Sequence, residues 1–133
     1  MDRDEMNTLK EKWPESLDAM TAAPEHHKVL LENDHVRVLD SRVGPGDSTP
    51  IHTHQWPSIL YILGTSDFVR YDADGNVIFD SRKSQKLPSN GTAIWSPPLP
   101  PHYVKNIGDT EIRVISIELK NQLDLDAGSN RIS

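Results

Sequence analysis

The sequence contains no cysteine among its 133 residues. This absence excludes disulfide bridges, thiolate metal ligands and cysteine nucleophiles together. No apolar run approaches the roughly 18 residues of a membrane-spanning helix. The N-terminus, which reads MDRDEMNTLKEKW, also lacks the apolar segment of a secretory signal. We therefore expect a cytoplasmic protein.

The chain is also poor in positive charge. Lysine and arginine number 14 against 20 aspartates and glutamates, which gives a net charge of −6. Nucleic acids and anionic membranes attract basic surfaces, so this balance predicts neither as a partner. A glycine-rich phosphate loop, a serine-hydrolase elbow and the spacings of cysteine-rich zinc modules are missing as well. A small-molecule ligand is the partner that remains.

The two ends differ from the middle of the chain in the pattern of apolar and polar residues. In residues 1–28 apolar positions recur at near-helical spacing until prolines interrupt them, which predicts an N-terminal arm, either helical or extended. Residues 121–133 are polar with little to bury, and we interpret them as a C-terminal tail. A single domain over residues 29–120 lies between the arm and the tail.

This central domain is a series of about eight short apolar strands separated by turn signals. HVRVLDSRV ends at Gly44-Pro45-Gly46, and SILYILG stops at Gly64. Asp74-Gly75 separates DFVRYD from VIFDSR and predicts a hairpin, because glycine tolerates a positive φ. No convincing helix interrupts the series. The spacing indicates an all-β fold, a sandwich or a barrel, and a jelly-roll barrel is the leading choice.

Three of the six histidines are candidate metal ligands. His52 and His54 lie two residues apart in PIHTHQW, and in a strand such side chains emerge on the same face, about 6–7 Å apart. A third ligand must come from elsewhere, and His102, which opens HYVKN after a proline-rich run, can face the pair across a barrel. Periodicity leaves open whether the three meet. Solvated or structural roles are assigned to the remaining histidines, His26, His27 and His35.

Two motifs in the chain resemble those of the cupin family. The first family motif, G-x5-H-x-H, is matched by Gly46, His52 and His54. The second, G-x5-P-x-G-x2-H-x3-N, is matched by Gly91, Pro97, His102 and Asn106, with Leu99 at its second glycine. The motifs stand in the family's order and cover residues 46–106. The resemblance implies a jelly-roll (cupin) β-barrel preceded by the arm.

The chain departs from the family pattern at the glutamate that completes the first motif. Counting forward from His54 places that glutamate at Ser58 or Ile59, and counting back from Gly64 places it at Pro57. None of these residues is acidic. The resemblance therefore implies a metal site of three histidines, without the fourth family ligand.

Some cupins with three-histidine iron sites resemble this pattern and cleave β-diketones or oxidise small thiols. The resemblance implies an enzyme in which His52, His54 and His102 hold a divalent ion that binds a small organic acid or carbonyl compound. Imidazole suits several metals, so Fe(II) is expected first and Mn, Ni, Cu and Zn are alternatives. A non-catalytic metal- or metabolite-binding cupin stays open, as does a metal-assisted isomerase or lyase of sugar acids.

Further site residues are predicted from their positions on the expected strands. The predicted substrate pocket consists of Trp56, Ser58, Leu60 and Trp95. The candidate catalytic residues are Arg70, Tyr103 and Glu118. Arg70 suits a substrate carboxylate if it faces inward, and Glu118 is the one barrel candidate for a substitute ligand or base. Packing is the alternative for the aromatic residues, and a solvated surface position is the alternative for Arg70.

The arm carries an apolar stripe, made of Met6, Leu9, Trp13, Leu17 and Met20. A stripe of this size is more useful when it covers a partner or the barrel than when it faces water. Jelly-roll cupins commonly pair through the faces of their sheets. We therefore predict a homodimer to which the arm contributes.

Overall fold

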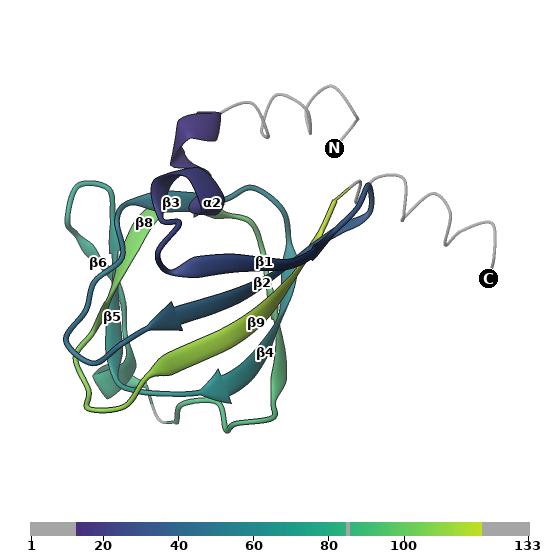
Figure 1. Ribbon diagram of the computed structural model, residues 1–133. Coiled ribbons are helices and arrows are strands. Elements are labelled where there is room, and N and C mark those ends of the chain that lie inside the picture. Colours follow the sequence, from purple (N-terminus) through teal and green to yellow (C-terminus); the bar gives the residue numbers. More distant parts are fainter. Residues whose placement is uncertain (1–12, 85, 121–133) are drawn as a thin grey trace.

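The computed structural model describes residues 13–84 and 86–120, which form two antiparallel sheets folded into a barrel (Figure 1). One sheet has the strand order β1-β2-β9-β4-β7 and the other β3-β8-β5-β6. The strands are β1 (His27–Glu32), β2 (Val36–Val43), β3 (His52–His54), β4 (Ser58–Gly64), β5 (Phe68–Asp72), β6 (Val77–Asp80), β7 (Ala93–Ser96), β8 (Leu99–Asn106) and β9 (Ile112–Leu119). The all-β jelly-roll class predicted from the sequence is confirmed.

Helical structure is confined to three short elements of the described residues. These are η1 (Glu15–Leu17), α2 (Ala19–Ala22) and η2 (Ser81–Lys83). The first two belong to the predicted arm, whose earlier stripe residues Met6 and Leu9 lie outside the described residues, as does the predicted tail. No helix in this part of the chain is both long and apolar enough to span a lipid bilayer.

The arm is attached to the barrel at the position of β3. Asp18 caps α2 by accepting a hydrogen bond from the backbone of Met20 at 3.1 Å, and it forms an isolated parallel bridge with Thr53 of β3. Figure 1 shows α2 beside β3 at one end of the barrel. β1 then begins at His27, so the last residues of the predicted arm are part of a sheet.

The predicted Asp74-Gly75 hairpin joins β5 to β6. Gly75 has a φ of 88°, and the Asp72 side chain accepts backbone hydrogen bonds from Asp74 and Asn76 at 2.9 Å each. Glycine is suited to this position because a side chain would strain a positive φ. The hairpin places β6 at the edge of the smaller sheet.

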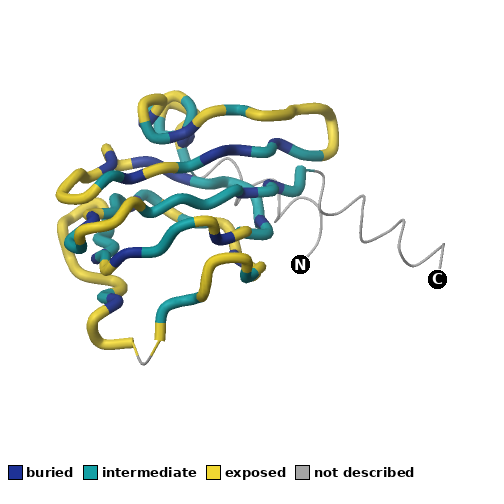
Figure 2. Tube along the Cα trace, turned by 60° about the horizontal axis from the view of Figure 1, so that its bottom comes forward, coloured by how far each residue is buried: buried dark blue, intermediate teal, exposed yellow. Residues whose placement is uncertain are grey.

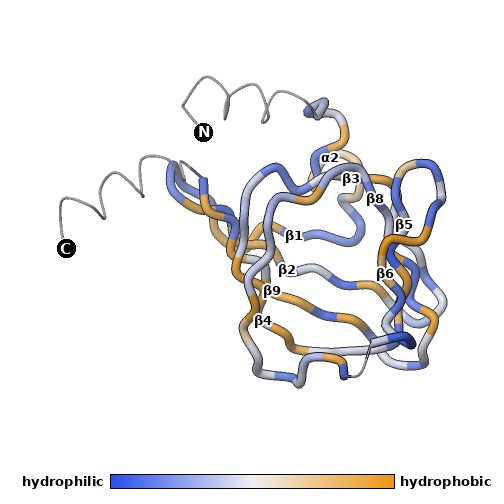
Figure 3. The backbone as a smooth tube through the Cα atoms, turned by 180° about the vertical axis from the view of Figure 1, so that it is seen from behind, coloured by the Kyte–Doolittle hydropathy of each residue, from blue (hydrophilic) through white to orange (hydrophobic). Residues whose placement is uncertain are grey.

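The barrel interior is polar to an unusual degree for a small domain. Figure 2 shows where buried residues lie along the chain, and Figure 3 shows hydrophobic and hydrophilic stretches alternating along β2, β9 and β4. The buried hydrophobic residues are Ala19, Ala23, Leu39, Val43, Ile62 and Val69, and buried polar or charged residues outnumber them. Polar groups are buried at a cost unless they are paired, so this interior is organised around a site.

Candidate metal centre

Four histidines from three strands meet inside the barrel. His52 lies at the centre of the group, with its ring centroid 4.5 Å from that of His102, 5.0 Å from that of His54 and 5.0 Å from that of His27. His27 and His54 are 5.4 Å apart by the same measure. The structure thus brings together the three histidines that the sequence singled out, and it adds a fourth.

The pairing of β3 with β8 explains how the family-motif histidines converge. His52 and His102 are direct cross-strand partners, whereas His54 pairs with Leu99. A shift of register between His52 and His54 marks an irregularity in β3. Bulges of this kind bend a strand and re-aim its side chains, which brings the two imidazoles closer than regular alternation would.

His27 is the residue that the sequence patterns missed. The ligand atoms of His27, His52 and His54 all lie within 4.8 Å of one another, a group that does not include His102. His27 is buried, not solvated. It reaches the cluster from β1, ahead of both family motifs, so no motif spacing marks it. The one local feature that could have indicated a role for His27 in the site is its position at the start of a strand.

Hydrogen bonds fix the tautomer of each ring. Three of the rings bond through Nδ1 to backbone carbonyls, namely His27 to Ala23 at 3.0 Å, His52 to Pro50 at 2.8 Å and His102 to Pro100 at 2.7 Å. A carbonyl oxygen can only accept, so Nδ1 must carry the proton in each case. In the neutral ring the lone pair is then on Nε2, the atom left available to an ion.

The protonation states also suit metal binding. Burial, reinforced by the neighbouring histidines, lowers the pKa of His52 to about 2. Burial likewise lowers the pKa of His102 to about 3 and that of His27 to about 4. These three imidazoles are therefore neutral at pH 7, and neutral imidazole is the form that ligates metals.

His54 is oriented by a carboxylate instead of a carbonyl. Its Nδ1 lies 3.1 Å from Oε2 of Glu118, and the other oxygen of Glu118 accepts a 2.5 Å hydrogen bond from Nε of Arg37. The remaining nitrogens of Arg37 donate to both oxygens of Asp18, at 2.9 and 3.0 Å. Asp18, Arg37, Glu118 and His54 thus form one buried chain of charged hydrogen bonds.

This series of hydrogen-bonded side chains places net negative charge behind the histidines. Burial alone would raise the pKa of Asp18 and of Glu118. The hydrogen bonds and charge of Arg37 outweigh this effect at both carboxylates, and those of His54 act in the same direction as Arg37 at Glu118. Both pKa values therefore lie below their usual range. Two carboxylates therefore face one guanidinium. A carboxylate behind a ligand histidine raises its basicity and fixes its orientation, as the partners of metal-bound histidines commonly do.

The carboxylate missing from the first family motif has a counterpart on β9. Ser58 of β4 is the direct cross-strand partner of Glu118, and both residues are buried. Glu118, predicted as a substitute ligand or base, has both oxygens engaged by Arg37 and His54. Its carboxylate stands behind a histidine instead of presenting a free oxygen to the cluster.

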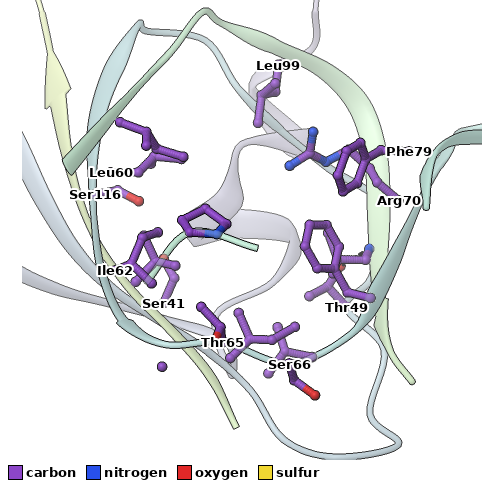
Figure 4. Close-up of a pocket in the computed structure, with 18 of the residues that line it drawn as sticks. Ser41, Thr49, Leu60, Ile62, Thr65, Ser66, Arg70, Phe79, Leu99 and Ser116 are labelled. Carbon is purple, nitrogen blue, oxygen red and sulfur yellow. Dashed lines mark hydrogen bonds between the residues drawn. The ribbon is translucent and has the colours of Figure 1, made fainter. Parts of the chain in front are cut away.

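The histidines line a pocket of about 320 Å³ that runs through the barrel (Figure 4). Ser58, Leu60 and Ile62 of β4 contribute to one wall, together with Ser116 of β9. Figure 4 shows Leu60 and Ile62 on the side opposite Arg70 and Phe79. A volume of this size is at the lower end of the range for sites that hold small organic ligands.

Three predicted aromatic site residues lie outside this pocket. Trp95 is 58% exposed because it pairs with Ile59 on the outer face, whereas the pocket-lining Ser58 and Leu60 face inward. Trp56 stacks under the Arg37 guanidinium, 4.9 Å from its ring centroid. For these two tryptophans the packing alternative applies.

Tyr103 also faces away from the pocket. It stacks on Tyr71 with ring centroids 4.7 Å apart, whereas its neighbours His102 and Val104 line the pocket. Alternation along β8 explains the difference, because successive side chains point to opposite faces.

Arg70 does line the pocket. Its neighbour across the β5–β6 pair is Phe79, and its guanidinium carbon lies 6.0 Å from the ring centroid of Phe68. Nε of Arg70 is buried without a hydrogen-bond partner in the described part of the chain. Burial lowers its pKa. The solvated position weighed from the sequence therefore does not apply to Arg70.

The donor set fits a divalent transition-metal ion. Across residues 13–84 and 86–120, no Nε2 of His27, His52, His54 or His102 has a hydrogen-bond partner within the chain. Convergent imidazole lone pairs, each ring held by a second hydrogen bond, are the arrangement that Fe, Ni, Cu and Zn favour. The ligand type does not decide between these metals.

Comparisons with known proteins match this architecture. No protein-family model matches the chain, and neither does any curated protein. A cupin-domain protein from Bordetella pertussis Tohama I is similar in structure, with a TM-score of 0.58 and 24% identity over 71% of this chain and 91% of its own. A second similar structure is an RmlC-like cupin family protein from Methanocaldococcus jannaschii. It has a TM-score of 0.51 and 14% identity over 75% of this chain and 84% of its own.

A third similar structure is a conserved protein with a double-stranded β-helix domain from Klebsiella pneumoniae, with a TM-score of 0.50 and 16% identity over 72% of this chain and 76% of its own. At these identities the likeness concerns the fold. It agrees with the two antiparallel sheets of this chain. The chain therefore has the fold of the cupin superfamily, as its two sequence motifs predicted.

Proposed function

We propose that this protein is a metal-dependent cupin enzyme that holds Fe(II) and oxidises a small organic acid or carbonyl compound with O₂. The observation that carries the proposal is the convergence of imidazoles inside an open pocket, where the ligand atoms of His27, His52 and His54 lie within 4.8 Å of one another. An ion with a purely structural role needs no such pocket. The ligands proposed are His52, His54 and His102, with His27 as an additional donor.

Each residue has a definite task in this proposal. The four imidazoles bind through Nε2, while Glu118 keeps the Nδ1 proton of His54 in place. The apolar side chains of the pocket exclude water from the ligand, which strengthens electrostatic interactions inside. A bound divalent ion would supply Lewis acidity and, in the case of Fe(II), redox chemistry at its open coordination positions.

A non-catalytic, metal- or metabolite-binding cupin is the second candidate. The observation that favours it is the fourth histidine, because four protein ligands are typical of closed structural sites rather than catalytic ones. A metal-assisted isomerase or lyase of sugar acids has less support. Leu60, Ile62 and Val114 give the pocket apolar walls that suit a polyhydroxylated ligand poorly.

The test begins with protein purified without a metal-chelating tag. Its metal content is measured, the chain is loaded anaerobically with Fe(II), and O₂ uptake is followed with a panel of small organic acids and carbonyl compounds. O₂ consumption with stoichiometric product supports the proposal. Product without O₂ consumption indicates an isomerase or lyase, and ligand binding without product indicates a binding protein.

Two variants control this experiment. His52→Ala removes the residue at the centre of the cluster and should abolish both bound metal and O₂ uptake. His35→Ala changes an exposed histidine outside the cluster and should leave both unchanged. O₂ uptake that persists in His52→Ala would assign the activity to a contaminant or to another site.

A further inference from the structure

We propose that Arg70 is the anion-binding residue of the pocket and that the ligand is a carboxylate with an apolar body. The proposal rests on the proposed function in one respect only, because it concerns the ligand of the same pocket. It adds a second anchor point on the β5 wall, separate from the histidines.

The first argument is that Arg70 has no hydrogen-bond or ion-pair partner among the residues that the structure describes. Its Nε is buried without a hydrogen bond, and neither a hydrogen bond nor an ion pair joins it to any other described residue. By contrast Arg37, which is buried, is paired with Asp18 and Glu118. A guanidinium whose Nε is buried without a partner costs stability, and a ligand that completes its hydrogen bonds would offset this cost.

The second argument is the direction in which Arg70 points. Arg70 pairs with Val104 of β8, and His102 lies two residues before Val104 on the same pocket-facing side. Figure 4 shows the Arg70 guanidinium reaching from the β5 wall into the pocket, near Leu99. A ligand held by Arg70 therefore extends along the same wall toward His102.

The third argument is the charge of the pocket lining. The charged side chains along the described lining are Arg70 and Lys86, and no aspartate or glutamate is among those residues. The formal charges on the described lining are therefore positive, whereas the carboxylates of Asp18 and Glu118 stand behind the histidines. A guanidinium offers two parallel N–H donors that match a carboxylate, which favours a carboxylate over a neutral amide or alcohol.

The fourth argument is the group of apolar side chains that lies around Arg70 and on the opposite side of the pocket. Phe68 and Phe79 flank Arg70, and Leu60, Ile62 and Val114 also line the pocket. These side chains offer few hydrogen bonds to a second polar group near Arg70. The ligand class that fits is a monocarboxylate whose aliphatic or aromatic body lies along the walls, with its reactive group toward the histidines.

The test uses a matched pair of probes, 3-phenylpropanoate and 3-phenylpropanamide, with binding measured by calorimetry on the full chain after removal of metal by chelation. The carboxylate should bind the unaltered protein about tenfold or more tightly than the amide. Arg70→Met should remove this preference, and Arg70→Lys should restore part of it. Arg82→Met is the control, since Arg82 is exposed and paired with Asp80, and it should keep the preference.

The metal-free condition separates this inference from the proposed function. A carboxylate preference that survives in the metal-free His52→Ala protein supports the role of Arg70 even if no metal is bound. A preference that appears only with metal, and persists in Arg70→Met, assigns the carboxylate to the ion and overturns the inference. Failure of the carboxylate to bind better than the amide in any form overturns it as well.

Thermal unfolding provides a second readout. Without ligand, Arg70→Met should melt at a higher temperature than the unaltered protein, because it removes an uncompensated buried charge. Saturating 3-phenylpropanoate should raise the melting temperature of the unaltered protein more than that of the variant. A lower melting temperature for the ligand-free variant would mean that Arg70 stabilises the fold, and it would contradict a ligand-binding role.

Discussion

Nδ1 of His54 lies 3.1 Å from Oε2 of Glu118, a residue 64 positions further along the chain. The contact joins β3 of one sheet to β9 of the other. Glu118 is fully buried and is the cross-strand partner of Ser58, one of the three positions that the motif spacing allows for the family's glutamate. The carboxylate of Glu118 thus holds a histidine of the cluster in place and has both of its oxygens engaged.

The first prediction concerns the ligands. Single changes of His52, His54 or His102 to alanine should abolish stoichiometric metal binding while the barrel stays folded. His27→Ala should also weaken binding, because its ligand atom lies within 4.8 Å of those of His52 and His54. Metal content and circular dichroism measure the two effects. Full occupancy in His102→Ala would remove His102 from the site.

The second prediction concerns Glu118. Glu118→Gln keeps the shape of the side chain but removes the negative charge behind His54. We expect metal affinity to fall by about 10- to 100-fold, the usual cost of losing a partner of a ligand histidine. Competition with a chelator of known affinity measures the change. Unaltered affinity would mean that the charge of Glu118 does not act through His54.

The third prediction concerns Arg37, which lies between two buried carboxylates. Arg37→Met leaves Asp18 and Glu118 buried without their cation and should lower the free energy of unfolding by about 3–5 kcal/mol. Chemical denaturation of the metal-free protein measures the loss. Arg42→Met is a control, because the Arg42 side chain is 49% exposed and its ion pairs should contribute about 1 kcal/mol or less.

The fourth prediction concerns acid stability. Hydrogen bonds from Arg113 and Arg42 lower the pKa of Asp40 below its ordinary value of 3.8, despite the opposing effect of burial. Asp40 therefore stabilises the fold at pH values above 3.8, and this contribution is lost as the pH falls through its folded-state pKa. Asp40→Asn should show a shallower loss of melting temperature below pH 4 than the unaltered protein. Identical acid profiles would contradict this account.

The fifth prediction concerns Ser58, the partner of Glu118. Ser58→Glu places a second carboxylate in the pocket wall and should lower the melting temperature of the metal-free protein, since a buried unpaired charge is costly. Added metal should restore much of the loss by binding the new oxygen, and activity should fall because an open coordination position is filled. Failure of metal to restore stability would mean that position 58 does not reach the ion.

The homodimer remains a prediction. The outer face of β4 and β7 exposes Tyr61, Leu63 and Trp95, by 41%, 37% and 58%, and these side chains offer a further surface for pairing. Sedimentation velocity at high micromolar concentration should detect a dimer, and Trp95→Lys should weaken it if this face is used. A monomer in the unaltered protein at that concentration would end the proposal.

The sequence by itself determined the fold class and singled out three candidate ligand histidines. Alternating apolar positions, turn residues such as Asp74-Gly75 and the two spaced motifs are local features, and local features need no knowledge of distant contacts. They were sufficient to predict an all-β barrel and to select His52, His54 and His102, which the structure brings close together.

Only the tertiary structure decided what surrounds these residues. His27 joins the cluster because β1 pairs with β2 at the edge of the larger sheet, and Glu118 reaches His54 because β9 lies between β2 and β4. Trp95 faces outward because a strand's register, rather than its composition, decides which side chains point inward. Contacts between residues far apart in sequence depend on register and strand order, which no local pattern encodes.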